Sequence, residues 1–241
     1  MGKIGHGYGS EWHLKRLLGA RCKQLESAVL AATGARQCDW HHAPYGRADS
    51  LGTREWQGVD FLPQSHPARV AYSDFWPARG NAPNWDAVAR LATGGDEEWL
   101  LVEAKAHKGE LRSDCRASTQ GGRPRIEGSL AEVKSALGAA ETCDWLTRAY
   151  QYCNRIAHLW FLSQQGIAAR LLFIYFTGDR FPAGAVDCPT SEAAWQEALA
   201  AQDLHVGVPP ESPLSDRMHR VFIDVGDQNL RMAPKAALAS K

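Results

Sequence analysis

The stretch from residue 85 to residue 107 constrains the fold most, because it contains two apolar runs separated by a short turn. The first run reads Trp-Asp-Ala-Val-Ala-Arg-Leu, the turn contains Gly-Gly-Asp, and the second run reads Trp-Leu-Leu-Val-Glu-Ala-Lys-Ala-His. Two runs rich in Val, Leu and Trp on either side of a short Gly-containing segment are typical of a β-hairpin. We therefore expect two neighbouring strands here.

Side chains of a strand alternate between two faces, so the hairpin also predicts which polar groups meet. In the second run, Glu103 and Lys105 share one face. In the first run, Asp86 lies on the face opposite to Trp85 and Ala87. If the two polar faces coincide, the two carboxylates can bind one hard cation, and the ammonium group stands beside whatever that cation polarises. Carboxylate oxygens are ligands that Mg²⁺ accepts, and Mg²⁺ keeps its other positions for water and substrate phosphate.

An acidic residue on one strand, followed by Glu-x-Lys on the next, resembles the motif of the PD-(D/E)XK nucleases, the restriction-endonuclease-like superfamily. Residues 103–105 read Glu-Ala-Lys and match the second half of the motif. Residues 84–86 read Asn-Trp-Asp and stand where the family has Pro-Asp, with Pro83 displaced by two positions. The resemblance implies metal-dependent hydrolysis of phosphodiester bonds and a core in the order α-β-β-β-α-β. The alternative is a salt-bridged strand end without chemistry.

The resemblance also implies roles for particular residues. Those expected to act in catalysis are Asp86, Glu103, Lys105 and Gln151. Those expected to hold Mg²⁺, for which Mn²⁺ can substitute, are Asp86, Glu103, the backbone carbonyl of Ala104 and Glu11. A carboxylate on a preceding helix contacts the metal or its water in many members of this superfamily, and Glu26 competes with Glu11 for that position. Asp60 and Asp74 are rivals of Asp86, but neither lies one hairpin before the Glu-x-Lys strand.

Gln151 is included because of a second, partial match. RecB-like members of the superfamily place Gln and then Tyr, four residues later, in a helix behind the active site. Here Gln151 is followed by Arg155 at that spacing. The alternative is that this helix only contributes to the core.

The formal net charge of the chain is zero, which argues against a protein that coats nucleic acid non-specifically. A basic segment nevertheless follows the proposed metal site directly. Lys and Arg contacts displace counterions from a phosphate backbone, so this segment predicts nucleic-acid binding. DNA is the expected partner, and RNA stays open. The alternative is a solvated loop. The residues expected to contact nucleic acid are Lys108, Arg112, Arg116, Arg123 and Arg125.

The remaining composition suggests a cytoplasmic protein. No run of 18 apolar residues is present, and the N-terminus lacks the apolar core of a signal peptide. The six cysteines are scattered without Cys-x-x-Cys spacing, which argues for a reducing compartment and against a disulfide framework. A homodimer would suit an enzyme that cuts two strands.

The whole chain predicts an α/β protein with a mixed central β-sheet flanked by helices, in one domain over residues 1–241 with loop insertions. The core is expected at 11–180, and a C-terminal helix and strand at 190–226. Residues 11–33 have the spacing of one amphipathic helix, with Ser10 as N-cap and Gly34 at its end. The apolar run 169–176 follows a long helix and predicts a buried parallel strand. Further helices are expected at 126–138, from about 142–144 to 165, and at 191–202; strands at 56–62, 69–75 and 219–225; and a loop at 35–55.

Two other functions stay open. A nuclease fold without cleavage activity could serve as a nucleic-acid-binding or interaction module. An unrelated α/β enzyme is the other alternative, but the sequence has no Gly-x-Ser-x-Gly elbow, no P-loop and no Gly-x-Gly-x-x-Gly after a strand. That alternative therefore lacks the residues to carry it.

Overall fold

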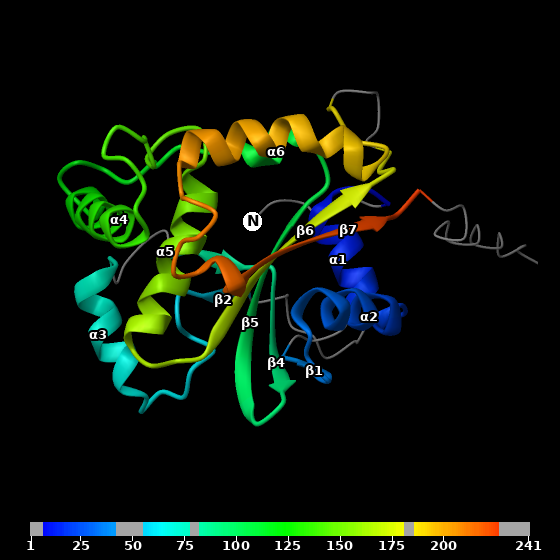
Figure 1. The fold of residues 1–241 in the computed structure, drawn as a ribbon, viewed down its shortest axis with the longest axis horizontal. Helices are drawn as coiled ribbons and strands as arrows, with labels where there is room; N and C mark the ends of the chain where they lie inside the picture. Colours follow the sequence, from blue (N-terminus) through cyan, green and yellow to red (C-terminus); the bar gives the residue numbers. More distant parts are fainter. Residues whose placement is uncertain (1–6, 42–54, 78–81, 181–185, 227–241) are drawn as a thin grey trace, which may run out of the picture.

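The predicted hairpin is confirmed and lies in the middle of the main sheet (Figure 1). Strand β4 spans Ala87–Thr93, β5 spans Asp96–Lys105, and the two pair antiparallel with Val88 opposite Leu101. The structure is a computed structural model, and it describes residues 7–41, 55–77, 82–180 and 186–226.

The main sheet has five strands in the order β1-β4-β5-β6-β7. β1 (Gln37–Trp40) pairs antiparallel with β4, whereas β6 (Ala169–Thr177) and β7 (Met218–Asp224) continue the sheet beyond β5 in parallel. The predicted buried parallel strand is therefore confirmed as β6. A parallel neighbour requires a crossover connection, and α4 (Arg123–Leu137) and α5 (Tyr150–Gln164) lie in that connection.

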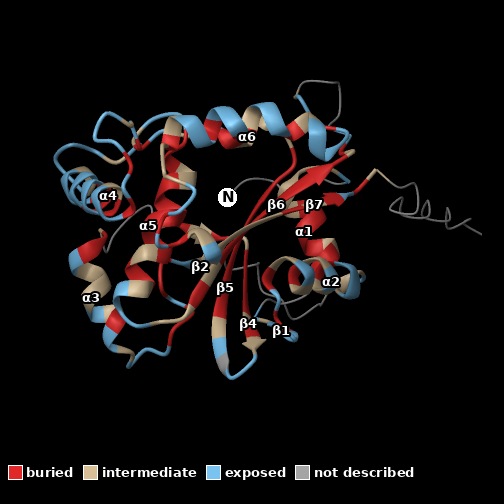
Figure 2. Ribbon diagram, in the orientation of Figure 1, coloured by how far each residue is buried: buried red, intermediate tan, exposed pale blue. Residues whose placement is uncertain are grey.

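The first face of the sheet is covered by α1 (Ser10–Leu18) and α2 (Cys22–Thr33), drawn in blue in Figure 1. Their apolar residues pack against aliphatic side chains of the central strands. Buried members of this core include Leu14, Leu25, Val29, Ala89, Leu100, Val102 and Ile174. Figure 2 shows the central strands buried along most of their length, whereas the turn between β4 and β5 is exposed. The prediction of an α/β protein with a mixed sheet flanked by helices is therefore confirmed.

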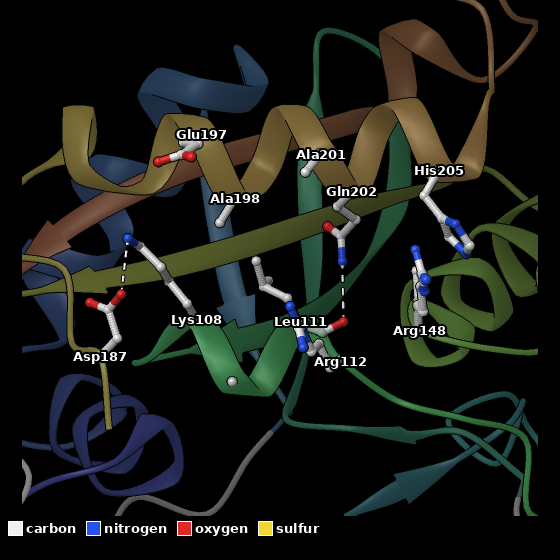
Figure 3. Close-up of a pocket in the computed structure, with 12 residues that line it drawn as sticks. Lys108, Leu111, Arg112, Arg148, Asp187, Glu197, Ala198, Ala201, Gln202 and His205 are labelled. Atoms are coloured by element: carbon white, nitrogen blue, oxygen red, sulfur yellow. Dashed lines mark hydrogen bonds and ion pairs between the residues drawn. The ribbon is translucent and has the colours of Figure 1, made fainter. Parts of the chain in front are cut away.

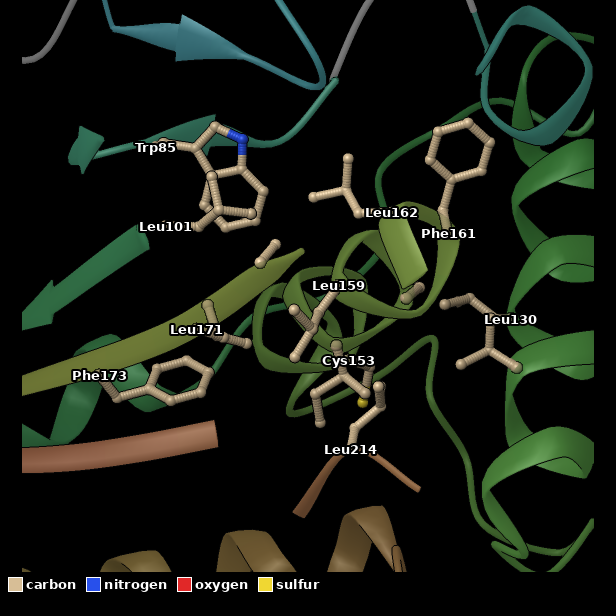
Figure 4. Packing of buried hydrophobic residues seen from close by; sticks show 14 of the residues in the cluster. Trp85, Leu101, Leu130, Cys153, Leu159, Phe161, Leu162, Leu171, Phe173 and Leu214 are labelled. Carbon is tan, nitrogen blue, oxygen red and sulfur yellow. The ribbon is translucent and has the colours of Figure 1, made fainter. Parts of the chain in front are cut away.

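The second face carries a larger core that is rich in aromatic residues. α5 packs on this face, and α3 (Pro67–Phe75), α4 and α6 (Glu192–Val206) contribute residues to the same core. Figure 4 shows part of it, with Trp85, Leu101, Cys153, Leu159, Leu171 and Phe173 among its members. A small second sheet, β2 (Trp56–Gln57) with β3 (Asn84–Trp85), leads the chain into β4.

The prediction of one helix over residues 11–33 is wrong, because two helices form there. The chain leaves helical geometry at Gly19, whose φ and ψ are −95° and −100°, and glycine is a poor helix former. Gly34 does end the second helix, with φ of 68°. Ser10 is not the N-cap, since Gly9 holds that position; the Ser10 hydroxyl instead donates to Glu110 Oε1 at 2.9 Å.

The strand predicted at residues 69–75 is a helix, α3. His66 Nδ1 accepts from the Ala68 N–H at 3.2 Å, and Pro67 occupies the first turn, so the start of this helix is well defined. The strand predicted at 56–62 is reduced to residues 56–57. The loop predicted at 35–55 contains β1, an edge strand formed by pairing with β4; residues 42–54 of that loop lie outside the described residues.

The remaining predicted elements are confirmed within a few residues, with one exception. The helix expected from about residue 142–144 begins only at Tyr150. Asp144 instead holds a turn, in which its carboxylate accepts from the Leu146 N–H at 2.8 Å and from the Thr147 hydroxyl at 2.7 Å. None of the described helices is long and apolar enough to span a membrane.

Candidate active site

Asp86 lies at the bend between β3 and β4, beside the end of β5. Its N–H donates to the Val102 carbonyl at 3.0 Å, and its carboxylate accepts from the Ala104 N–H at 2.7 Å. These two bonds fix Asp86 across from Glu103 in the antiparallel register. The predicted position of Trp85 is wrong: the bend brings it into the same core as Val88, instead of the opposite one.

Glu103 is 2% exposed and is held by two cations. Lys105 Nζ lies 2.5 Å from Glu103 Oε1, and Arg155 Nε lies 2.8 Å from Oε2. Burial disfavours the charged carboxylate, but Arg155 and Lys105 outweigh burial and lower the pKa of Glu103 below its usual range. Glu103 is therefore ionised and fixed in place.

Asp86 has the opposite electrostatic environment. Burial, and next the negative charge of Glu103, raise the pKa of Asp86 to about 8. Lys105, the Ala104 N–H and Arg155 compensate only in part. A carboxyl group in this environment gains stability from any added cation, which is the electrostatic property of a cation site.

Lys105 connects the hairpin with α5. Its Nζ donates to Gln151 Oε1 at 2.8 Å in addition to its bond with Glu103. The Gln151 N–H donates to Ser113 Oγ at 2.7 Å, which anchors the first turn of α5. The fold therefore brings Asp86, Glu103, Lys105 and Gln151 together from the bend before β4, the end of β5 and the first turn of α5.

Among the described contacts, the two candidate carboxylates of the preceding helix bond to neighbours on their own helices. Glu11, in the first turn of α1, pairs with Lys15. Glu26, on α2, accepts from Cys22 Sγ at 3.1 Å. Across the described ranges, no three or more His, Cys, Asp or Glu side chains are arranged to hold a metal ion. Glu11 as a third metal ligand therefore stays a prediction.

The two alternative candidates for the position of Asp86 do not lie on the hairpin. Asp60 pairs with Arg69, and Asp74 lies exposed on α3.

The basic residues predicted to bind nucleic acid differ in their contacts. Arg123 pairs with Glu127 on α4 at 2.7 Å, and Arg125 donates to the Ser73 carbonyl, so these two have structural contacts. Arg116 is exposed.

Lys108 and Arg112, by contrast, lie close to the hairpin end. Lys108 Nζ is 3.0 Å from Asp187 Oδ2, and both Lys108 and Arg112 line a pocket beside α6.

Three residues of the site were not predicted as functional. Arg155 is 3% exposed and braces Glu103, and its spacing of four from Gln151 on one helix was the available signal. Glu110 Oε2 accepts from the N–H groups of Ala106 at 2.5 Å and His107 at 3.2 Å, which closes the turn after β5. Tyr175 is fully buried, and its hydroxyl has no hydrogen-bond partner in the part of the chain that the structure describes. A small cavity is lined by Glu103, Lys105, Glu110, Leu111, Gln151, Tyr152, Phe173, Tyr175 and Gln202.

Comparisons of the chain with protein-family models, with curated proteins and with solved structures find no match. The inference of function therefore depends on the geometry of this site and on the order of the elements around it.

Proposed function

We propose that the protein is a metal-dependent phosphodiester hydrolase of the PD-(D/E)XK type, acting on nucleic acid and on DNA rather than RNA. The observation that carries the proposal is the convergence of Asp86, Glu103 and Lys105 at one end of the hairpin, with Gln151 bonded to Lys105. The order of α1–α2, β1, β4, β5, α5 and β6, with β2, α3, β3 and α4 between them, supports it, because the motif implies elements in the order α-β-β-β-α-β.

The side chains present fit a hard divalent cation. Mg²⁺ is commonly held through one or two carboxylates, with water and substrate phosphate completing its shell. Asp86 and Glu103 would supply the carboxylates, and the Ala104 carbonyl a further oxygen. The raised pKa of Asp86 supports this fit, because burial and next the charge of Glu103 disfavour its ionised form, and a bound cation would favour that form. When bound, such an ion lowers the pKa of a bound water and neutralises charge on the phosphate.

Lys105 and Gln151 act on the phosphate and the attacking water. The Lys105 ammonium is buried between Glu103 and Gln151, and a cation in such a setting stabilises the charge that develops on phosphate oxygens. The Gln151 amide orients that ammonium and offers a hydrogen bond to the water. Arg155 is a positioning residue, since it holds the second oxygen of Glu103.

A cleavage assay tests the proposal. Plasmid, linear duplex, single-stranded DNA and RNA are incubated with Mg²⁺ or Mn²⁺, with an EDTA control. We expect metal-dependent cutting of at least one DNA substrate, lost in Asp86→Asn and in Lys105→Ala. Cutting that persists in clean preparations of both variants would rule out this site as its source.

A second function, nucleic-acid binding without cleavage, is favoured by one observation. Both oxygens of Glu103 are already paired with protein cations, Lys105 and Arg155, which can replace a metal ion. Calorimetry with Mn²⁺ separates the two functions. Binding of Mn²⁺ that is lost in Asp86→Asn supports the hydrolase, whereas nucleic-acid binding without any Mn²⁺ binding supports the inactive module.

The environment and assembly that we propose follow from the same chemistry. All six cysteines are among the described residues and none of them forms a disulfide there, in keeping with a reducing cytoplasm. A homodimer is proposed only if the substrate is cut on both strands. Gel filtration of the protein with its cleaved substrate tests that assembly.

A further inference from the structure

A pocket of about 760 Å³ lies between α6 and the short 3₁₀ turn η1 (Lys108–Leu111), as Figure 3 shows. We call it the α6 pocket. Leu111 and Gln202 line both this pocket and the small cavity that holds Glu103 and Lys105. Its volume falls within the range of about 300–1,000 Å³ that is usual for small-ligand sites. A ligand-sized space therefore opens directly beside the candidate active site.

Two guanidinium groups line the α6 pocket. The side chains of Arg112 and Arg148 form no hydrogen bond or ion pair within the described residues. Lys108 is already paired with Asp187 at 3.0 Å, and Glu197 is the remaining carboxylate of the lining. A guanidinium presents a planar fork of donors that matches the oxygens of a phosphate group. The pocket therefore has the donors to hold a phosphate.

The backbone at Arg148 is held in an unfavourable conformation. Its φ is 60°, and it is the one non-glycine residue with positive φ in the described ranges. The Arg148 N–H donates to Asp114 Oδ1 at 2.8 Å, and its carbonyl accepts from the Ser113 N–H at 2.7 Å. Glycine would adopt this conformation without strain. The exchange Arg148→Gly therefore removes the guanidinium without disfavouring the local backbone.

The inner wall of the α6 pocket offers an unused hydrogen-bond acceptor. Gln202 is 7% exposed, and its Nε2 lies 3.5 Å from the Leu111 carbonyl, whereas its Oε1 accepts no hydrogen bond from any described residue. Buried polar atoms are nearly always paired, so an unpaired one calls for a ligand or a solvent partner. Ala198 and Ala201 of α6 add an apolar surface beside it. Amide and apolar surface together suit a nucleobase, since each base has an N–H donor on its pairing edge.

We propose that the α6 pocket binds one unpaired nucleotide of the substrate strand, next to the phosphodiester at the candidate active site. Arg112 and Arg148 hold the phosphate of this nucleotide. Its base lies against the alanines of α6 and donates a hydrogen bond to Gln202 Oε1. The identity of the ligand rests on the proposed function. The preferred substrate is then single-stranded, because a base that is stacked and paired in a duplex cannot enter the pocket.

Fluorescence polarisation in EDTA tests this proposal without metal or cleavage. The probes are a short mixed-sequence DNA strand labelled at its 3′ end, its blunt duplex, and the same strand with abasic sites. We expect the wild-type protein to bind the single strand about tenfold more tightly than the duplex, because only an unpaired base can reach Gln202 Oε1. Equal or tighter binding of the duplex, or no binding of any probe, would overturn the proposal.

Three variants locate the binding in the α6 pocket. Arg148→Gly should weaken single-strand binding by about tenfold, whereas Arg36→Ala, which removes an exposed arginine beside β1, should leave it within about twofold. Ala201→Trp should block the pocket without a change of charge and reduce binding at least as much. Gln202→Leu should weaken binding of the intact strand and leave binding of the abasic strand unchanged. Equal effects of Arg148→Gly and Arg36→Ala would contradict the proposal.

Failure of this proposal is distinguishable from failure of the proposed function. Pocket-dependent binding in EDTA, combined with no cleavage under any metal, leaves the α6 pocket standing and favours the non-cleaving module. Metal-dependent cleavage that needs Lys105 but is indifferent to Arg148→Gly and Ala201→Trp keeps the hydrolase and removes the nucleotide pocket.

Discussion

Adjacent residues of β5 face two different environments, although both are buried. Leu100, Val102 and Ala104 point to the α1–α2 face, where most of the clustered side chains are aliphatic. Glu103 and Lys105 point to the α5 face, among aromatic and charged groups. Burying an ion pair costs desolvation even when the charges are paired, and apolar side chains of similar volume often stabilise a fold more. The charged cluster around Glu103 therefore gives up stability that an apolar cluster at the same place would provide. The difference teaches that burial alone does not mark a structural core, because on this sheet the candidate active site lies on a buried face.

The largest expected difference between the two faces is an effect on turnover, and a substitution of Lys105 tests it. The exchange Lys105→Ala should reduce turnover by about 10²–10³-fold, because it removes the cation that stabilises charge in the transition state. The fold should persist, since Arg155 still pairs with Glu103 at 2.8 Å. Cleavage rates and far-UV circular dichroism check both parts. Lys23→Ala, an exposed lysine on α2, is the matched control and should cleave at the wild-type rate.

Arg155→Met should have the largest effect on stability. It leaves Glu103 buried with only Lys105 as a partner, and breaking a buried ion pair typically costs about 3–5 kcal/mol. Urea unfolding at neutral pH measures the loss. Adding Glu103→Gln in the same chain should restore part of the stability, because the uncompensated charge is then absent. If Arg155→Met alone were as stable as the wild type, the buried charge of Glu103 would not need Arg155 as a partner.

Leu100→Ala tests the other face. Leu100 is fully buried among aliphatic side chains, so the exchange should lower the free energy of unfolding by about 2–5 kcal/mol through lost burial and a cavity. Turnover should remain at the wild-type level at temperatures where the variant is folded. If turnover fell as far as in Lys105→Ala, the two faces would not be separable and the comparison would fail.

The hairpin and its polar pair could be predicted because their signals are local. Alternation along β5 places Glu103 and Lys105 on one face whatever the rest of the chain does. The continuous apolar run of β6 is equally informative, since a strand buried on both faces needs apolar residues throughout. The coarse fold follows from the order of such segments.

The parts that could not be predicted depend on tertiary contacts. β1 has only one buried residue, Cys38, and it is a strand because β4 supplies its hydrogen bonds. The run at 69–75 reads as a strand by its residue types, but capping by His66 and Pro67 starts a helix. Arg155 could be seen four residues after Gln151, but its pairing with Glu103 depends on how α5 packs on the sheet. Sequence spacing does not determine that packing.

The two faces can also be compared by how stability changes with pH, because the titratable His158 lies on the α5 face. Its Nδ1 lies 2.7 Å from the Asn154 carbonyl and its Nε2 2.8 Å from the Tyr72 hydroxyl, so a neutral ring donates to the carbonyl and accepts from the hydroxyl. Burial lowers the pKa of His158 to about 3. In the unfolded chain the imidazole takes up a proton near pH 6.5. Stability is therefore lost as the pH falls from about 6.5 towards 3, by on the order of a few kcal/mol.

His158→Gln isolates this contribution, because an amide can serve both hydrogen-bond partners and does not titrate in this range. Urea unfolding at pH 7, 5.5 and 4 should show a smaller loss for the variant than for the wild type. The profile of the variant must be subtracted from that of the wild type because Asp86 acts in the opposite direction. The raised pKa of Asp86, about 8, makes stability fall as the pH rises from about 4 to 8. Leu100→Ala should keep the wild-type pH dependence, since it changes no titratable group. Parallel profiles for the wild type and His158→Gln would mean that the acid sensitivity does not originate at His158.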